Sequence, residues 1–214
     1  SDNGDSGDSG SSSFQAEHGV VVATRAADGD SGAHAIIDTD NPDNKRLDIN
    51  PAGSDLIVRG YGEHFFRFNR TTGTVAKFSS NEPGEVLWDY ALGDDSNPHD
   101  HVVTSDHKAY VLHKVKNYAY QVDPSAAQSG QFPTEAKAID LGHYAVAGTP
   151  PNMTAGVVVD GRLYIVMQRL DNTWTPSNAY VAVIDVDDNT EIKTNAGSDD
   201  LKGIELETKN PQEL

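Results

Sequence analysis

The chain has 214 residues, 36% of them hydrophobic, and its 33 acidic and 16 basic side chains give a formal net charge of −17 at pH 7. A chain of this length can bury a real core. So negative a surface argues against a nucleic-acid partner and against docking on an anionic membrane by charge. The absence of cysteine excludes disulfides and thiolate metal sites, and no apolar run is long enough for a transmembrane segment.

Residues 1–13 contain only Ser, Asp, Asn and Gly. Without apolar side chains this stretch cannot offset the entropy lost on ordering. We therefore predict a disordered acidic linker over residues 1–13 and one repeat domain over residues 14–214. Linkers of this kind commonly separate a surface domain from an anchor. We expect a lipid anchor upstream and a location at the cell surface, either extracellular or periplasmic.

Three units repeat one another in the order of the chain. Each contains a short apolar strand, a polar turn, a second apolar strand and a third strand. The first strands lie at residues 55–58, 108–111 and 162–166, the second at 65–69, 118–123 and 180–185, and the third at 74–78, 136–141 and 190–193. The first strands begin 53 and 54 residues apart. Short antiparallel strands at this spacing predict β-propeller blades, and no segment has helical periodicity.

The predicted fold class is therefore all-β, with repeated four-stranded antiparallel units. Radial closure needs about four to eight blades, whereas three are visible in the sequence. Asn210-Pro211 repeats the Asn97-Pro98 that opens the second unit and has the form of another start. Two arrangements satisfy this pattern. The chain is part of a longer propeller, or it is an open stack whose unpaired strand edges favour a homo-oligomer.

The second and third units resemble the YVTN/YncE-like propeller repeats of bacterial surface and periplasmic proteins. The resemblance is carried by Asn97-Pro98-His99-Asp100 and the segment that follows it to Pro124, and by Asp160-Gly161-Arg162-Leu163-Tyr164 with residues 182–185. It covers roughly residues 20 to 214. Such a resemblance implies architecture and says little about function.

The chain also resembles the surface copper-binding proteins CorA and MopE of methanotrophs, which are exported and acidic. Members of that group bind Cu(I) through two histidines and a kynurenine made from tryptophan. The resemblance implies a copper site in which Trp88 supplies the tryptophan-derived ligand.

A metal site is also predicted from the residues themselves. Alignment of the units on their first strands places His113 opposite Gly60 and Met167, and His64 lies just across the equivalent turn of the first unit. We therefore expect His64, His113 and Met167 to emerge at the same end of neighbouring sheets. Two imidazoles and a thioether suit Cu(I) better than Mg²⁺ or Ca²⁺. The alternative is that the histidines are solvated and that Met167 packs in the core.

Two further groups of residues have metal-ligand character. His99 and His101 lie two residues apart, which places them on one face of an extended segment, although we interpret His99-Asp100-His101 as the polar entry to a blade. The acidic turns at residues 38–41 and 185–189 offer oxygen ligands for calcium, the second candidate ion. Asp and Asn are also ordinary turn formers, which is the interpretation we favour there.

Catalytic motifs are missing from the sequence. The G-x-S-x-G elbow, H-E-x-x-H and the P-loop are all absent, so we expect that the chain is not an enzyme. Two hypotheses remain. The first is an exported cell-surface protein that captures or stores copper. The alternative is an interaction module that binds another surface protein or a polysaccharide through an apolar or aromatic patch near Tyr61, Tyr90 or Trp174.

Overall fold

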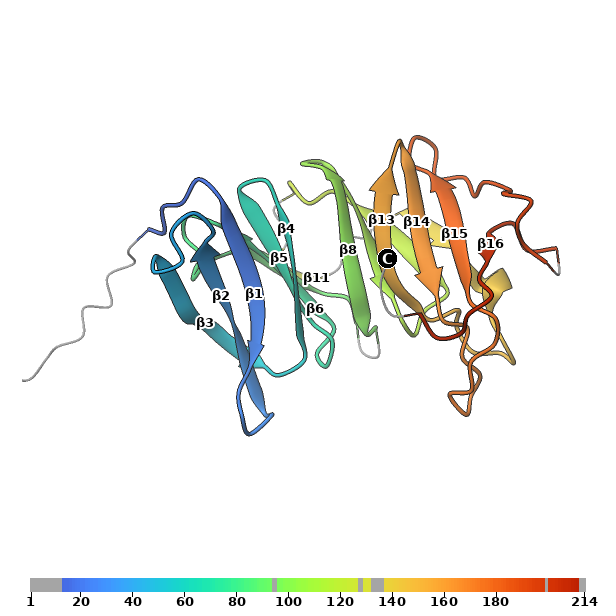
Figure 1. Ribbon diagram of the computed structural model, residues 1–214, viewed down its shortest axis with the longest axis horizontal. Helices are drawn as coiled ribbons and strands as arrows, with labels where there is room; N and C mark the ends of the chain where they lie inside the picture. The colour runs from blue at the N-terminus through green and yellow to red at the C-terminus, as the bar shows by residue number, and fades with distance from the viewer. Residues whose placement is uncertain (1–12, 94–95, 127–128, 132–136, 199, 212–214) are drawn as a thin grey trace, which may run out of the picture.

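The computed structural model describes residues 13–93, 96–126, 129–131, 137–198 and 200–211. Within these ranges the regular structure is β-strand apart from one 3₁₀ turn, Gly142–Tyr144. The strands form four sheets that stand in a row in the order of the chain, without closing into a ring (Figure 1). The prediction of an all-β, propeller-like repeat is confirmed. The predicted linker falls outside the described residues except for Ser13.

Consecutive strands pair antiparallel within each sheet, and the sheets are named I to IV along the chain. Sheet I contains β1 (Gly19–Arg25), β2 (Ser31–Asp38) and β3 (Lys45–Gly53). Sheet II contains β4 (Leu56–Tyr61), β5 (His64–Asn69), β6 (Thr74–Ser79) and β7 (Val86–Ala91), with β11 (Ser129–Gln131) parallel to β7. Sheet III contains β8 (Pro98–Ser105), β9 (Lys108–His113), β10 (Tyr118–Val122) and β12 (Lys137–Asp140). Sheet IV contains β13 (Met153–Val159), β14 (Arg162–Met167), β15 (Tyr180–Asp185) and β16 (Ile204–Glu205). None of the described segments is a helix long and apolar enough to cross a bilayer.

One backbone hydrogen bond recurs in all four sheets and shows which strands are equivalent. The residue after the second strand donates its N–H to the carbonyl of the residue before the first strand, at N···O distances between 2.9 and 3.1 Å. The pairs are Thr39 with His18, Arg70 with Asp55, Lys114 with Asn97, and Gln168 with Asn152. Strands β1, β4, β8 and β13 are therefore the first strands of equivalent repeats, and β2, β5, β9 and β14 are the second strands.

This equivalence corrects the sequence alignment in two respects. Sheet I is a further repeat that the three predicted units did not include. Residues 56–58 belong to β4, a first strand, whereas residues 108–111 and 162–166 belong to β9 and β14, which are second strands. The alignment was one strand out for the first unit because both kinds of strand are short, apolar and followed by a tight turn.

The predicted third strand at residues 190–193 forms only an isolated bridge between Ile184 and Glu191. The edge strand of sheet IV is instead β16, which pairs with the start of β15.

Each inner sheet packs on both of its neighbours because side chains alternate between the two faces of a strand. On β5, the Phe66 ring lies 4.4 Å from that of His101 in sheet III. Phe65 and Arg67 point the other way, toward His34 in sheet I. Sheets III and IV share the largest core cluster found among the described residues, which includes Tyr110, Leu112, Met153, Ile165, Met167 and Tyr180.

Asp100 joins the first strands of three successive sheets. Its side chain is only 3% exposed. Oδ1 accepts hydrogen bonds from Arg59 Nε on β4, at 2.6 Å, and from the backbone N–H of His101. Oδ2 accepts one from the Gly156 N–H on β13, at 2.9 Å. Gly156 permits this approach, since an added Cβ would lie 2.8 Å from Val102 Cγ2.

We expect Asp100→Ala to lower the free energy of unfolding by about 2–4 kcal/mol, because the N–H of Gly156 loses its acceptor and Arg59 its partner. Urea denaturation of the variant and the parent chain measures this difference. Asp43→Asn, an exposed change in sheet I, serves as the control and is expected to stay within about 0.5 kcal/mol of the parent. Equal stability of Asp100→Ala and the parent would refute the role given to Asp100.

His34 is fully buried between sheets I and II. Its Nε2–H donates to the Pro83 carbonyl at 2.6 Å, and Nδ1 accepts from Arg67 Nη1 at 3.0 Å. These partners suit the neutral imidazole, whose acceptor nitrogen faces a guanidinium. Burial lowers the pKa of His34 from its ordinary 6.5 to about 4, the Pro83 hydrogen bond opposes that shift, and the charge of Arg67 adds to it.

This lowered pKa predicts loss of stability in mild acid. Above pH 6.5 the imidazole is neutral in both states, but between pH 6.5 and about 4 it binds a proton mainly in the unfolded chain. At pH 5 the difference amounts to about 2 kcal/mol. His34→Gln, which cannot titrate, should therefore lose about that much less stability than the parent between pH 7.5 and 5 in urea denaturation. Equal losses in the two proteins would show that His34 is not the group responsible.

Candidate functional site

His64 and His113 lie at opposite ends of their sheets. His64 is the first residue of β5, next to the β4–β5 turn, and His113 is the last residue of β9. Burial lowers the pKa of His64, Lys77 acts in the same direction, and nearby Asp106 acts against them. Asp106 belongs to the turn before β9, so the length of β9, about 16 Å, separates that turn from His113. In the corrected register the counterpart of His113 in sheet II is Asn69 and not Gly60.

The other two predicted ligands also lie apart from this pair. Met167 is fully buried in the core cluster between sheets III and IV, on the side of sheet III to which Leu112 points. His113 follows Leu112 and therefore points to the opposite side. Trp88 is buried in sheet II, where its ring stacks on that of Tyr90 at 5.2 Å.

The structure thus does not bring His64, His113, Met167 and Trp88 together. Among the described residues, no three His, Cys, Asp or Glu side chains are arranged to hold a metal ion. In the acidic turns, Asp38 Oδ1 accepts hydrogen bonds from the backbone N–H groups of Asp40 and Asn41, and Asp185 Oδ1 accepts one from Asp187. These carboxylates serve their own turns. Binding of copper or calcium stays a prediction.

The segment His99-Asp100-His101 is more deeply placed than the polar entry we expected. Asp100 and His101 are both buried, and both ring nitrogens of His101 lack a hydrogen-bond partner. His101 pairs with Val111 across β8 and β9, and Val111 shares a face of β9 with His113. His113 Nδ1 lies 3.2 Å from the Ser96 carbonyl, while its Nε2 has no partner. Burial lowers the pKa of His101 to about 3 and that of His113 to about 4.

Of the three aromatic residues proposed for a binding patch, Trp174 is the one on the surface. It is 65% exposed, whereas Tyr90 is buried and Tyr61 is half-buried. The Lys114 ammonium lies 5.9 Å from the centroid of the Trp174 ring. Lys114 belongs to the turn between β9 and β10, so the turn of sheet III and the Trp174 loop of sheet IV meet here.

Two surface depressions flank this turn and share Val115. One, of about 180 Å³, is lined by Trp174 with Thr149, Pro150, Asn152, Leu170, Asp171 and Asn172. The other, of about 390 Å³, is lined by Arg70, Thr71, Asn97 and Lys116. We call the surface formed by the two depressions, Lys114 and Trp174 the Trp174 face. In the sequence, the signal for this face was Trp174 itself, an aromatic residue in a polar loop between two strands.

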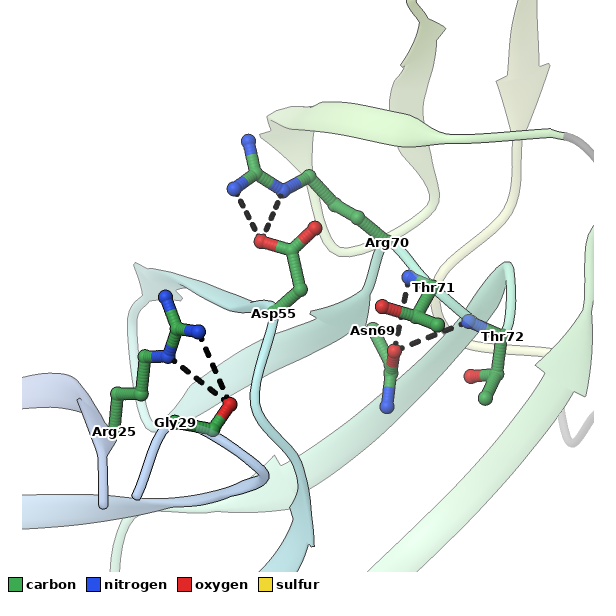
Figure 2. A network of polar contacts seen from close by, with 7 residues as sticks. All are labelled: Arg25, Gly29, Asp55, Asn69, Arg70, Thr71 and Thr72. Carbon is green, nitrogen blue, oxygen red and sulfur yellow. Dashed lines mark hydrogen bonds and ion pairs between the residues drawn. The ribbon is translucent and has the colours of Figure 1, made fainter. Parts of the chain in front are cut away.

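The sheet II side of this face is held by short polar contacts (Figure 2). Arg70 Nε donates to Asp55 Oδ1 at 2.8 Å, and Arg70 Nη2 contacts the same oxygen. Asn69 Oδ1 accepts hydrogen bonds from the N–H groups of Thr71 and Thr72, both at 3.1 Å. These bonds fix the turn that carries Arg70 and Thr71 to the second depression.

The charges at the Trp174 face are mainly positive, unlike those of the chain as a whole. Burial lowers the pKa of His99 to about 4, and the charges of Arg70 and Lys114 lower it further. Burial also lowers the pKa of Lys114, with a contribution from Arg70. Lys116 contributes to the lowered pKa of His113. Arg70 and Lys114 thus act on His99, where the carboxylate of Asp55 opposes them, and Lys116 acts on His113.

No family model matches the chain, and no curated protein matches it in sequence. Several solved β-propeller-like structures are similar in fold. Citrobacter koseri AztD is 14% identical over 81% of this chain and 46% of its own, with a TM-score of 0.43. Virginiamycin B lyase from Staphylococcus aureus is 13% identical over 81% and 56%, with a TM-score of 0.49. The dihydro-heme d1 dehydrogenase NirN is 14% identical over 88% and 44%, with a TM-score of 0.37. This chain therefore spans about half the length of these proteins.

These comparisons correct the expectation that the chain is not an enzyme. A lyase and a dehydrogenase are among the proteins of similar fold, so a missing sequence motif does not exclude catalysis on this architecture. At 13–14% identity the likeness concerns the fold alone and assigns no activity to this chain.

Proposed function

We propose that the chain is a binding module of the bacterial cell surface and that its Trp174 face binds a polysaccharide carrying carboxylate groups. The observation that carries the proposal is the 65% exposed Trp174 ring beside the Lys114 ammonium, between two depressions. An exposed aromatic ring beside a cation and between two depressions combines the apolar surface and the charge that binding sites use.

The loop that carries Trp174 is held in one conformation before any ligand binds. Asp171 Oδ1 accepts hydrogen bonds from the N–H groups of Thr173 and Thr175. The Trp174 N–H donates to the Asp171 carbonyl, and Trp174 has a φ of 62°, in the left-handed region. Such a backbone is unusual for a bulky residue and is kept where the surroundings impose it. A preformed loop lowers the entropic cost of binding.

The ligand class follows from the chemistry of the two depressions. The flat indole offers a stacking surface for a sugar ring, and Asp171 and Asn172 offer hydrogen bonds for its hydroxyl groups. On the other side of the turn, Lys116 is placed to pair with a carboxylate, whereas Arg70 already pairs with Asp55.

We expect Trp174→Ala to weaken binding to polygalacturonate at least tenfold, because the stacking surface is lost. Lys116→Ala should weaken it less and reduce its dependence on salt. Affinity electrophoresis and isothermal titration calorimetry measure both effects. Leu47→Ala, which removes an equally exposed apolar side chain from sheet I, is the control and should bind like the parent.

Two results would contradict this proposal. In one, polygalacturonate does not retard the parent protein. In the other, neutral dextran binds as tightly as polygalacturonate, which would leave the three cations without a role in recognition.

Copper capture is the second candidate function, and the pair His101 and His113 favours it. Three of their four ring nitrogens have no partner, and their lowered pKa values keep both rings neutral at pH 7. Neutral imidazole is the form that binds metal. On adjacent strands the two residues are diagonal neighbours on one face, which places such residues about 7–8 Å apart. Two buried imidazoles form a low-coordinate set suited to Cu(I).

Copper retention after loading with Cu(I) and desalting distinguishes the two histidine pairs. We expect His101→Ala and His113→Ala each to abolish retention, and His64→Ala to leave it unchanged, with circular dichroism checking that each variant keeps its sheets. Loss in His64→Ala with retention in His101→Ala would favour the pair predicted from the sequence. Retention in all three variants, or in none of the proteins including the parent, would remove copper from consideration.

A further inference from the structure

A cavity of about 430 Å³ lies between sheets I and II, at the end of the molecule opposite sheet IV, and is independent of the Trp174 face. We propose that it binds a linear organic diammonium ion, of the chemical class of the aliphatic diamines. Its volume is in the range of small-molecule sites, about 300–1,000 Å³. Its walls come from the segment before β1, from β1 and β2, from β4 and β5 with the turn between them, and from the two residues after β6.

The walls of the cavity are tied together by backbone hydrogen bonds. The Phe14 N–H donates to the Asn81 carbonyl at 2.7 Å, and the Ser80 N–H donates to the Glu63 carbonyl at 2.9 Å. Phe14 is also buried against Ile36 in the small core of sheet I. These bonds fix the segment before β1 against the end of sheet II where β6 ends. The cavity is therefore formed before a ligand enters.

The charged side chains that line the cavity are both acidic. Glu17 comes from the segment before β1 and Glu63 from the β4–β5 turn, and none of the described lining residues is Lys or Arg. His64 also lines the cavity, and burial lowers its pKa, so it is neutral at pH 7 and adds no positive charge. A cation entering here therefore gains two carboxylate partners. Lys77, whose charge acts on His64, donates to the Pro124 carbonyl beside sheet III and does not line the cavity.

The shape of the site favours an organic cation over a metal ion. Glu17, Glu63 and His64 are not gathered closely enough to form a metal-binding group within the described chain. The two carboxylates belong to different walls, which suits one ammonium group at each end of a chain. Between them Phe14 and Phe65, which are 4% and 1% exposed, form an apolar floor for methylene groups.

Calorimetric titration with cadaverine tests the proposal, with pentylamine as a ligand of the same length and one ammonium group. We expect cadaverine to bind the parent at least fivefold more tightly than pentylamine, and Glu17→Gln and Glu63→Gln each to weaken cadaverine about fivefold. Glu207→Gln, an exposed change in the C-terminal segment, should have no effect.

Gly60→Leu supplies a steric test that does not alter charge. Gly60 lines the cavity, and an added Cβ would meet nothing within 4 Å, so a leucine side chain can occupy the space without disturbing the strand. We expect this variant to lose cadaverine binding and to keep the thermal midpoint of the parent. Should it fail to fold, the glutamate variants still decide the question.

The proposal is overturned if the parent does not bind cadaverine, if pentylamine binds equally well, or if both glutamine variants bind like the parent. None of these results depends on whether polygalacturonate binds the Trp174 face, since the cavity and that face share no lining residue.

Discussion

The arrangement of the sheets depends on one buried carboxylate. Asp100 accepts hydrogen bonds from Arg59 on β4 and from Gly156 on β13 while belonging to β8 itself. A buried carboxylate is tolerated only when its oxygens are satisfied, so sheets II, III and IV can approach closely only in the register that satisfies it. Apolar packing alone would fix the register between the sheets less strictly, because two apolar faces of similar size can shift against each other at little cost in free energy.

The recurring bond between the ends of the first and second strands leaves one position of each repeat free to vary. Its donor is a backbone N–H, so this hydrogen bond does not depend on which side chain the residue carries. Thr39, Arg70, Lys114 and Gln168 occupy the position in the four sheets. Arg70 and Lys114 place positive charge at the Trp174 face, whereas Gln168 Nε2 donates to the Pro211 carbonyl. The same backbone scaffold thus supports binding chemistry in two repeats and packing in another, as is usual for residues on connecting turns.

Strand positions could be predicted from the sequence because apolar side chains cluster in short segments between turn residues, as in residues 65–69 and 180–185. The equivalence of strands could not, because it is defined by backbone hydrogen bonds that are the same for any side chain. Sheet I escaped notice because β2, Ser31–Asp38, is rich in small residues and contains the buried His34. The predicted histidine pair does not converge for the same reason. The displaced alignment equated the end of β9, where His113 lies, with the end of the first strand β4, which is next to His64. The burial of His101 was not predicted, because the sequence of one strand does not show whether a second sheet covers it.

The separation of charge along the row of sheets bears on both binding proposals. The chain carries a net charge of −17, yet the cations Arg70, Lys114 and Lys116 gather where sheets II, III and IV present their turns, and Glu17 and Glu63 line the cavity between sheets I and II. In physiological salt a charge acts over roughly 8 Å, so each site responds to its own side chains more than to the total. In a closed ring all such turns would lie around one axis, and the electrostatic potentials of their charges would overlap. An open row keeps them apart, and a single chain can therefore offer an anion site and a cation site at once.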